Sequence, residues 1–113
     1  MRSVQIGNAR QAQVLFKDYV NRGINPETIE VEKSATSEVT GRTVKFDIVA
    51  ENTATEVKAG YVSGSDAKVQ IRNQFYASQE NGLQYRYVVY GRISWPVKLV
   101  LIRFNIPFEE RGE

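Results

Sequence analysis

The feature of this sequence that most constrains its fold is a change in the spacing of the apolar residues. Between about residues 8 and 22 they recur every three or four positions, which is typical of an amphipathic helix. From Thr28 onward they alternate with polar residues, as in strands with one buried face. A second helical segment, from Ser65 to about Asn81, interrupts these strands. A helix between strands predicts a crossover, and hence at least one parallel pair of strands.

The first helix has clear end signals. Asn8 is a suitable N-cap, and Gln11 stands at the capping-box position three residues later. Gly23 suits a left-handed C-cap, and Asn25-Pro26 prevents the helix from continuing. A helix is therefore predicted over about residues 8–22.

The strands are bounded by turn residues. The first strand contains Ile29 and Val31, with a partner within residues 35–39. The other strands are expected at 44–50, 54–59, 84–93 and 97–106, followed by a polar tail. The sequence therefore predicts one α/β (α+β) domain over residues 1–113, with a mixed central β-sheet of about five strands and a helix on each face.

The composition excludes several kinds of chemistry. The chain of 113 residues contains neither Cys nor His. Without Cys there is no disulfide framework and no thiolate nucleophile. Without His, imidazole catalysis and nearly all zinc sites are excluded. Hydrolytic chemistry would therefore need carboxylates, lysine, hydroxyl groups or a hard cation bound by oxygen atoms.

Two observations bear on location. The longest nearly apolar stretch, 97–104, is interrupted by Lys98 and Arg103, so no membrane span is expected. The first five residues lack the apolar core of a secretory signal. The chain is therefore expected to be either a cytosolic protein or a domain taken from a longer chain.

Candidate catalytic residues lie on the predicted strands at 44–50 and 54–59. Glu56 and Lys58 are two apart on one strand and therefore share a face, and a turn near Asn52 brings Asp47 opposite Glu56. Two carboxylates beside a lysine suit Mg²⁺, which prefers oxygen ligands. The main-chain carbonyl of Val57 could add a third protein oxygen. The pattern predicts a metal-dependent phosphodiesterase site, with a solvated Glu–Lys pair on an exposed strand as the alternative.

The same chain contains a second copy of this spacing. Asp66 and Lys68 are also two residues apart, but they lie at the start of the predicted second helix. Residues two apart on a helix diverge by about 200°, so these two side chains do not converge. Only Glu56 and Lys58 follow an aspartate-bearing strand.

Three runs of the sequence resemble the PD-(D/E)XK, or restriction-endonuclease-like, nuclease superfamily. They are KFDIVAENTATEVKAG at 45–60, SDAKVQIRNQFYASQENG at 65–82 and QYRYVVYGRI at 84–93. The resemblance covers about residues 8–106 and implies a core ordered α-β-β-β-α-β. It also implies that Asp47 and Glu56 ligate Mg²⁺, with Mn²⁺ as a substitute, and that Lys58 is catalytic.

The resemblance also suggests a further site residue and a biological setting. Many members have a catalytic Gln on the second helix, and Gln70 matches it best, with Gln74 one turn later; an exposed helical residue is the alternative for Gln70. Within the superfamily, the sequence pattern most resembles nuclease domains at the C-termini of bacterial polymorphic and contact-dependent growth inhibition toxins. It therefore implies an acidic immunity protein in the producing cell. It also implies a cytoplasmic site of action, reached by delivery within a larger secreted protein.

The sequence departs from the family in its first helix, where many members place an additional Glu ligand. That helix offers Asp18 in place of Glu, together with Gln11 and Gln13. The extra acid is therefore absent or comes from elsewhere, and three residues are nominal substitutes: Glu30, Glu32 and Glu38.

Several other residues suit contact with nucleic acid. The net charge of +2 permits such a partner without requiring it. Four cations near the site are candidates for phosphate contacts, with scattered surface charge as the alternative: Arg42, Lys45, Lys68 and Arg72. Tyr85 and Tyr87 alternate along a strand and are expected to pack on the sheet, while Trp95 is expected to anchor a loop or contact a partner.

Three functions fit these observations. The first is a small Mg²⁺-dependent nuclease acting on DNA or RNA as a toxin effector. The second is a nuclease of repair or recombination, similar to a junction resolvase. The third is a binding module that kept the fold without the chemistry, which the missing acid of the first helix favours.

Overall fold

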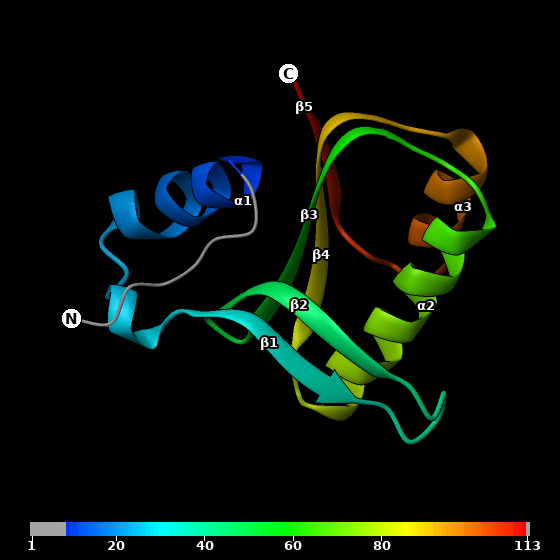
Figure 1. Cartoon of the computed structure of the whole chain (residues 1–113), viewed down its shortest axis with the longest axis horizontal. Helices are drawn as coiled ribbons and strands as arrows, with labels where there is room; N and C mark the ends of the chain where they lie inside the picture. The colour runs from blue at the N-terminus through cyan, green and yellow to red at the C-terminus, as the bar shows by residue number, and fades with distance from the viewer. Residues whose placement is uncertain (1–8, 113) are drawn as a thin grey trace.

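A mixed five-stranded sheet, in the order β1-β2-β3-β4-β5, organises the chain (Figure 1). The computed structural model describes residues 9–112. β1, β2 and β3 are antiparallel neighbours, whereas β4 runs parallel to both β3 and β5. The strands are β1 Glu30–Thr36, β2 Thr43–Ala50, β3 Thr53–Val62, β4 Gln84–Ile93 and β5 Phe108–Arg111. The predicted mixed sheet is therefore confirmed.

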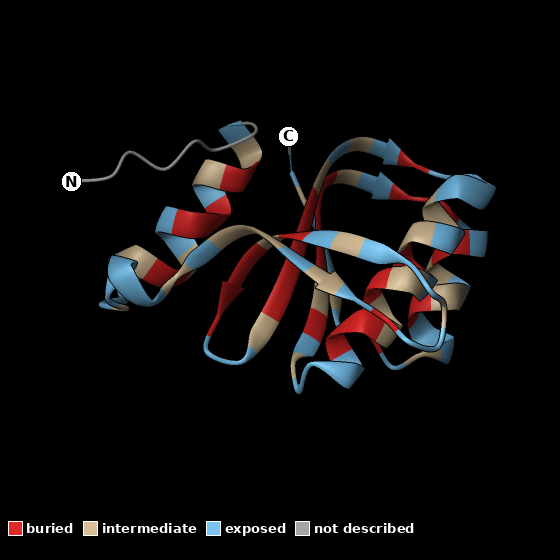
Figure 2. Cartoon of the chain, turned by 60° about the horizontal axis from the view of Figure 1, so that its bottom comes forward, coloured by how far each residue is buried: buried red, intermediate tan, exposed pale blue. Residues whose placement is uncertain are grey.

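The predicted crossover is made by helix α2, Ser65–Glu80, which connects β3 to the parallel strand β4. Together with α3, Trp95–Arg103, it covers one face of the sheet. Figure 2 shows that the buried residues are concentrated in the central strands. The predicted bounds of the second helix and of the strand at 84–93 are confirmed almost to the residue.

The opposite face is covered by the N-terminal helical region. It consists of α1, Ala9–Val14, a π-helical turn over Leu15–Tyr19 and a 3₁₀ turn over Val20–Arg22. Gly23 follows with φ of 93°, so the predicted left-handed C-cap is confirmed. A further 3₁₀ turn over Pro26–Thr28 leads into β1. Asn8, the predicted N-cap, lies outside the described residues.

The strand predicted at 97–106 is wrong, because these residues form most of α3. Ser94 occupies the N-cap position and Pro96 lies in the first turn, where proline suits a helix. Val97 and Leu101, four residues apart, are both fully buried, as expected for one face of a helix. The predicted anchoring of Trp95 in a loop is also wrong, since Trp95 begins this helix and is 68% exposed.

Two other predictions at the sheet edges need correction. Residues 108–111, predicted as a polar tail, form β5 beside β4. The first strand runs without interruption over Glu30–Thr36, so residues 35–39 contain no separate partner strand; residues 38–40 form a turn. Tertiary pairing decides both regions, because neither has a strongly apolar pattern of its own.

The two readings of residues 97–106 predict different effects of two leucine substitutions. On α3, Leu101 is fully buried whereas Leu99 is 60% exposed. Leu101→Ala should therefore lower the free energy of unfolding by about 2–5 kcal/mol, and Leu99→Ala by less than about 0.5 kcal/mol. On a strand the two residues would share a face, so equal losses in denaturant-induced unfolding would contradict the helix.

Candidate active site

A tight hairpin sets the register of the two strands that carry the candidate residues. The two-residue loop Glu51–Asn52 joins β2 to β3, and both residues have positive φ, of 53° and 61°. Such a loop matches the twist of paired strands. The antiparallel pairing predicted between 44–50 and 54–59 is therefore confirmed near the turn, where Ala50 pairs with Thr53.

The two strands separate where the candidate acids lie. Their pairing extends to Ile48 and Thr55, and the next pair in this register would be Asp47 and Glu56. In place of a ladder bond, the main-chain N–H of Val57 donates to Asp47 Oδ2 at 2.8 Å. The N–H and C=O of a strand residue point to the same side, so the Val57 carbonyl is also directed toward β2. Main-chain and side-chain oxygen atoms thus face a gap between β2 and β3.

Glu56 is the most buried charged residue of this site, with 3% of its surface exposed. Its Oε2 accepts a hydrogen bond from Gln70 Nε2 at 3.3 Å and lies 3.2 Å from Lys58 Nζ. The carboxyl groups of Glu56 and Asp47 are also close enough for each to change the pKa of the other. The predicted convergence of the two acids and the lysine is therefore confirmed, and Gln70 does approach them.

The pairing of these acids in a buried place changes their ionisation. Burial and the nearby charge of Asp47 raise the pKa of Glu56 to about 8, although Lys58 acts in the opposite direction. Burial also raises the pKa of Asp47, against the hydrogen bond from the Val57 N–H. Without a further positive charge, the site therefore holds a proton near neutral pH.

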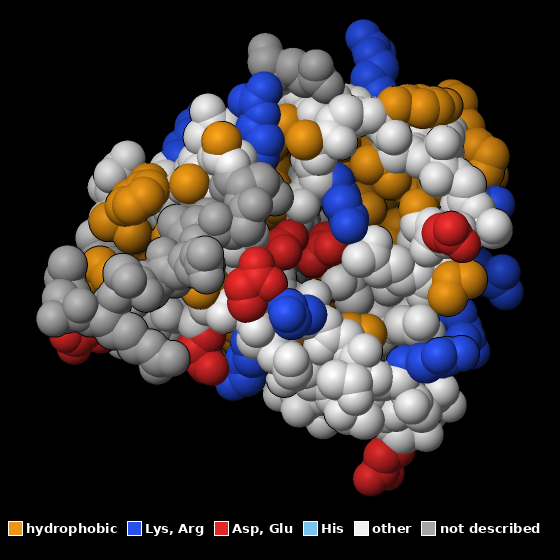
Figure 3. All heavy atoms as spheres, in the orientation of Figure 1, with side chains coloured by type: hydrophobic (Ala, Val, Ile, Leu, Met, Phe, Trp, Pro, Cys, Tyr) orange, Lys and Arg blue, Asp and Glu red, His pale blue; other side chains and the backbone are white. Residues whose placement is uncertain are grey.

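Glu32 is a third acid beside this pair. It faces the position of Asp47 in the β1–β2 register, and its charge raises the pKa of Asp47. Its φ of 55° is an unusual backbone conformation for a residue within a strand, and such strain is often found at functional sites. Figure 3 shows acidic side chains gathered near the middle of one face, with basic side chains on both sides. The sequence offered Glu30, Glu32 and Glu38 in place of the acid that the first helix lacks. Of these three, Glu32 is the one whose charge changes the pKa of Asp47.

The donor set suits a hard divalent cation. Glu56 Oε1 is buried and has no hydrogen-bond partner among the described residues, which is costly unless something binds it. The repulsion that raises both pKa values would be relieved by a cation between the carboxylates. Within residues 9–112 no three acidic side chains form a ready-made metal cage. Mg²⁺ does not need one, since it usually takes one or two carboxylates and keeps several waters.

Two residues that the sequence offered for the site have structural roles instead. Gln74 is buried, accepts a hydrogen bond from Tyr85 and donates to the Lys45 carbonyl at 3.2 Å, so it is not available to the site. Asp18 binds Arg86 and Arg111, both at 2.7 Å, and ties the N-terminal region to β4 and β5. These contacts exclude Asp18 as the missing ligand.

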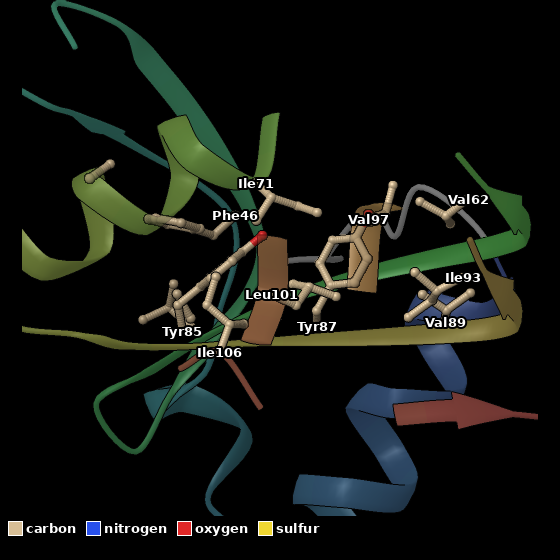
Figure 4. Close-up of a cluster of buried hydrophobic side chains, with 13 residues drawn as sticks. Phe46, Val62, Ile71, Tyr85, Tyr87, Val89, Ile93, Val97, Leu101 and Ile106 are labelled. Atoms are coloured by element: carbon tan, nitrogen blue, oxygen red, sulfur yellow. The ribbon is translucent and has the colours of Figure 1, made fainter. Parts of the chain in front are cut away.

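Two buried residues beside the site were not expected from the sequence. Gln11 of α1 donates to the main-chain carbonyl of Asp47 at 3.1 Å and so supports β2 from the opposite face. Tyr87 pairs with Glu56 in the β3–β4 register, and its hydroxyl is buried without a hydrogen-bond partner in the described part of the chain. Figure 4 shows Tyr87 in the cluster that also contains Val97 and Leu101. The predicted packing of Tyr85 and Tyr87 on the sheet is confirmed. No sequence signal predicted that the Tyr87 hydroxyl would lie at the site.

The predicted phosphate-binding cations are distributed around the acids. Lys45 is exposed and lines a hollow of about 430 Å³ together with Gln70 and Asn73. Lys68 and Arg72 lie one turn apart on α2, and Arg72 is exposed over the ring of Tyr76 at 5.2 Å. The fourth cation, Arg42, is exposed in the β1–β2 turn. Of these cations, Lys45 is the one that shares a hollow with Gln70, the residue that donates to Glu56.

Comparison of the chain with protein-family models, with curated proteins and with solved structures found no match. Among the described residues, no helix has both the length and the apolar character needed to cross a membrane. The geometry and chemistry of the site are therefore the basis on which a function is proposed below.

The raised pKa of Glu56 predicts how stability depends on pH in the absence of metal. The folded protein keeps this proton up to about pH 8, whereas the unfolded chain loses it near the ordinary value of 4.5. The unfolded state therefore binds fewer protons between these values. The free energy of unfolding in EDTA should fall from about pH 5 to about pH 8, by up to about 1.4 kcal/mol per pH unit. Denaturant unfolding at a series of pH values measures this slope.

The control for this experiment is Glu56→Gln, which has no ionisable group at this position. In this variant the free energy of unfolding should fall much less between pH 5 and pH 8. The variant should therefore be more stable than the wild type at pH 8. The acids with lowered pKa, such as Asp18 and Glu110, contribute only at lower pH. A wild-type stability that rises between pH 5 and 8 would contradict the assignment.

Proposed function

We propose that this protein is a metal-dependent nuclease that hydrolyses phosphodiester bonds with Mg²⁺, or Mn²⁺ in its place. The observation that supports this most is the pairing of buried Glu56 with half-buried Asp47, beside Lys58, where the two strands separate. Glu56 has an unpartnered oxygen there, which suits a cation ligand. The resemblance of residues 45–60 to the PD-(D/E)XK pattern points to the same chemistry.

Each residue has a distinct role in this proposal. Asp47, Glu56 and the Val57 carbonyl would hold the cation, which would supply Lewis-acid activation of water and of phosphate. Gln70 fixes the orientation of the Glu56 carboxylate through its hydrogen bond to Oε2. In hydrolysis, water adds to phosphorus as one P–O ester bond breaks, and negative charge increases on the non-bridging oxygens.

Lys58 is suited to act on that developing charge. Its Nζ lies 3.2 Å from Glu56 Oε2, while a third of its side chain remains exposed. If a cation neutralised the Glu56 carboxylate, the interaction between Lys58 and Glu56 would weaken. The ammonium group could then bind a phosphate oxygen or the attacking water. A fixed positive charge at this position favours the transition state over the ground state.

Removal of Lys58 should reduce catalysis without unfolding the protein. In Lys58→Ala, Mg²⁺-dependent cleavage of plasmid or total RNA should fall by at least about 10²-fold, the usual cost of losing one group that stabilises transition-state charge. Glu56→Gln should lose cleavage and also bind Mg²⁺ more weakly. Gel assays with Mg²⁺, Mn²⁺ or EDTA, and a metal titration followed by thermal denaturation, measure the two effects.

Matched controls are available on β1. Lys33 and Glu30 form an exposed ion pair at 3.0 Å, so Lys33→Ala and Glu30→Gln remove the same charges away from the proposed site. Both variants should retain wild-type cleavage. Full activity in Lys58→Ala would falsify the assignment, and a wild type that binds Mg²⁺ without cleaving any nucleic acid would favour a non-catalytic binding module.

The toxin setting is an extension of this proposal and is supported by the resemblance alone. Expression of the wild-type chain inside a bacterium should then arrest growth, because cleavage of cellular nucleic acid would follow, whereas Glu56→Gln should be tolerated. An acidic immunity protein would protect the cell by occupying the cations around the site, with an association rate that falls as salt rises. Equal growth with both chains would exclude the toxin setting and leave a nuclease of repair or recombination.

A further inference from the structure

Tyr61 is an aromatic residue at the end of β3 that the proposed chemistry does not use. It is 69% exposed, the largest value among the large apolar side chains of the described residues. The preceding residue, Gly60, has φ of 88°, a conformation that favours glycine. Packing in the core therefore does not account for a large aromatic ring at this position.

Tyr61 lies next to the proposed reaction centre. It lines a hollow of about 510 Å³ together with Lys58, Gln70 and Tyr87, so the ring shares one concave surface with the catalytic lysine. It also lines a second hollow, of about 530 Å³, together with Arg92 and Gly91. Each hollow is within the range of sites that bind small organic ligands. The ring thus stands between two hollows, with most of its surface open.

The charges beside the ring suit a nucleotide chain. Lys58 is on one side, and Arg92, which pairs with Tyr61 in the β3–β4 register, is exposed in the second hollow. Each hollow also has one acid in its lining, Asp66 in the first and Glu110, which pairs with Lys98, in the second. Phosphate groups alternate with bases along nucleic acid, so a cation on each side of an aromatic ring matches that alternation. A third hollow, with Lys45 and Asn73, shares Gln70 in its lining with the hollow that contains Tyr61 and Lys58.

We propose that Tyr61 is a stacking platform for an unpaired nucleobase beside the phosphate that is cleaved. This inference rests on the proposed nuclease function and specifies its substrate class. A base within a duplex has both faces covered by its neighbours, so an exposed ring can stack only on a base that is unpaired or splayed out. The substrate is therefore single-stranded or looped nucleic acid.

The test compares two probes of equal charge. One is a dye-labelled single-stranded oligonucleotide of thymidines, and the other is a strand of the same length and phosphate count with abasic sugars. Fluorescence anisotropy is measured at low salt in EDTA, where the proposed cleavage is absent. The wild type should bind the base-bearing strand at least about fivefold more tightly, since stacking of one base on an aromatic ring gives about this gain or more.

Substitutions of Tyr61 then identify the platform. Tyr61→Ala should reduce affinity for the base-bearing strand to that for the abasic strand, and leave affinity for the abasic strand unchanged. Tyr61→Phe keeps the ring and should behave as the wild type. Because Tyr61 is exposed, neither variant should change the melting temperature. A wild type with no preference for bases, or a preference that persists in Tyr61→Ala, overturns the proposal.

The outcome can be separated from that of the nuclease function. Cleavage that depends on Lys58, without any preference for bases in binding, keeps the nuclease and removes the platform. A preference for bases that depends on Tyr61, without cleavage that depends on Lys58, keeps a nucleic-acid-binding surface and removes the chemistry. Tighter binding to a duplex of the same length than to the single strand would also contradict the inference.

Discussion

The burial of Glu56 beside Asp47 is the interaction on which the architecture of the candidate site depends. Two carboxyl groups in a place that excludes water cannot both be ionised cheaply, and their pKa values rise accordingly. The charge of Lys58 offsets this cost only in part, because the pKa of Glu56 is still raised to about 8. Binding of a cation where β2 and β3 separate would offset the cost of placing the two carboxyl groups together, which explains why the fold contains this pair.

Several independent elements maintain this arrangement. The Glu51–Asn52 loop sets the register, and the Val57 N–H holds Asp47 at the end of the ladder. Gln70, from the crossover helix, and Lys58, from the same strand, both contact one oxygen of Glu56 and leave the other unpartnered in the described residues. The geometry therefore follows from the crossover topology, which places α2 over the face of β3 that carries the acids.

Much of this could be predicted from the sequence, because local patterns determine it. Alternation placed β2 and β4, and helical spacing placed α2. The short turn after Ala50 made Asp47 and Glu56 opposite neighbours. The prediction of a strand at 97–106 is wrong because most of these positions are apolar. In such a stretch the strand period of two and the helical period are hard to distinguish. The separation of the strands and the burial of Glu56 depend on contacts distant in sequence. The same is true of Gln11 and of the Tyr87 hydroxyl.

The central claim, that these acids form a divalent cation site, is tested most directly by crystallography with Mn²⁺. An anomalous difference map should show a peak between Asp47 and Glu56, within coordination distance of an oxygen of each carboxylate. Glu56 Oε1 should be among the ligands, and Lys58 Nζ should have moved away from Glu56. A map with no peak between the two carboxylates at millimolar Mn²⁺, with Lys58 Nζ still in contact with Glu56, would contradict the account.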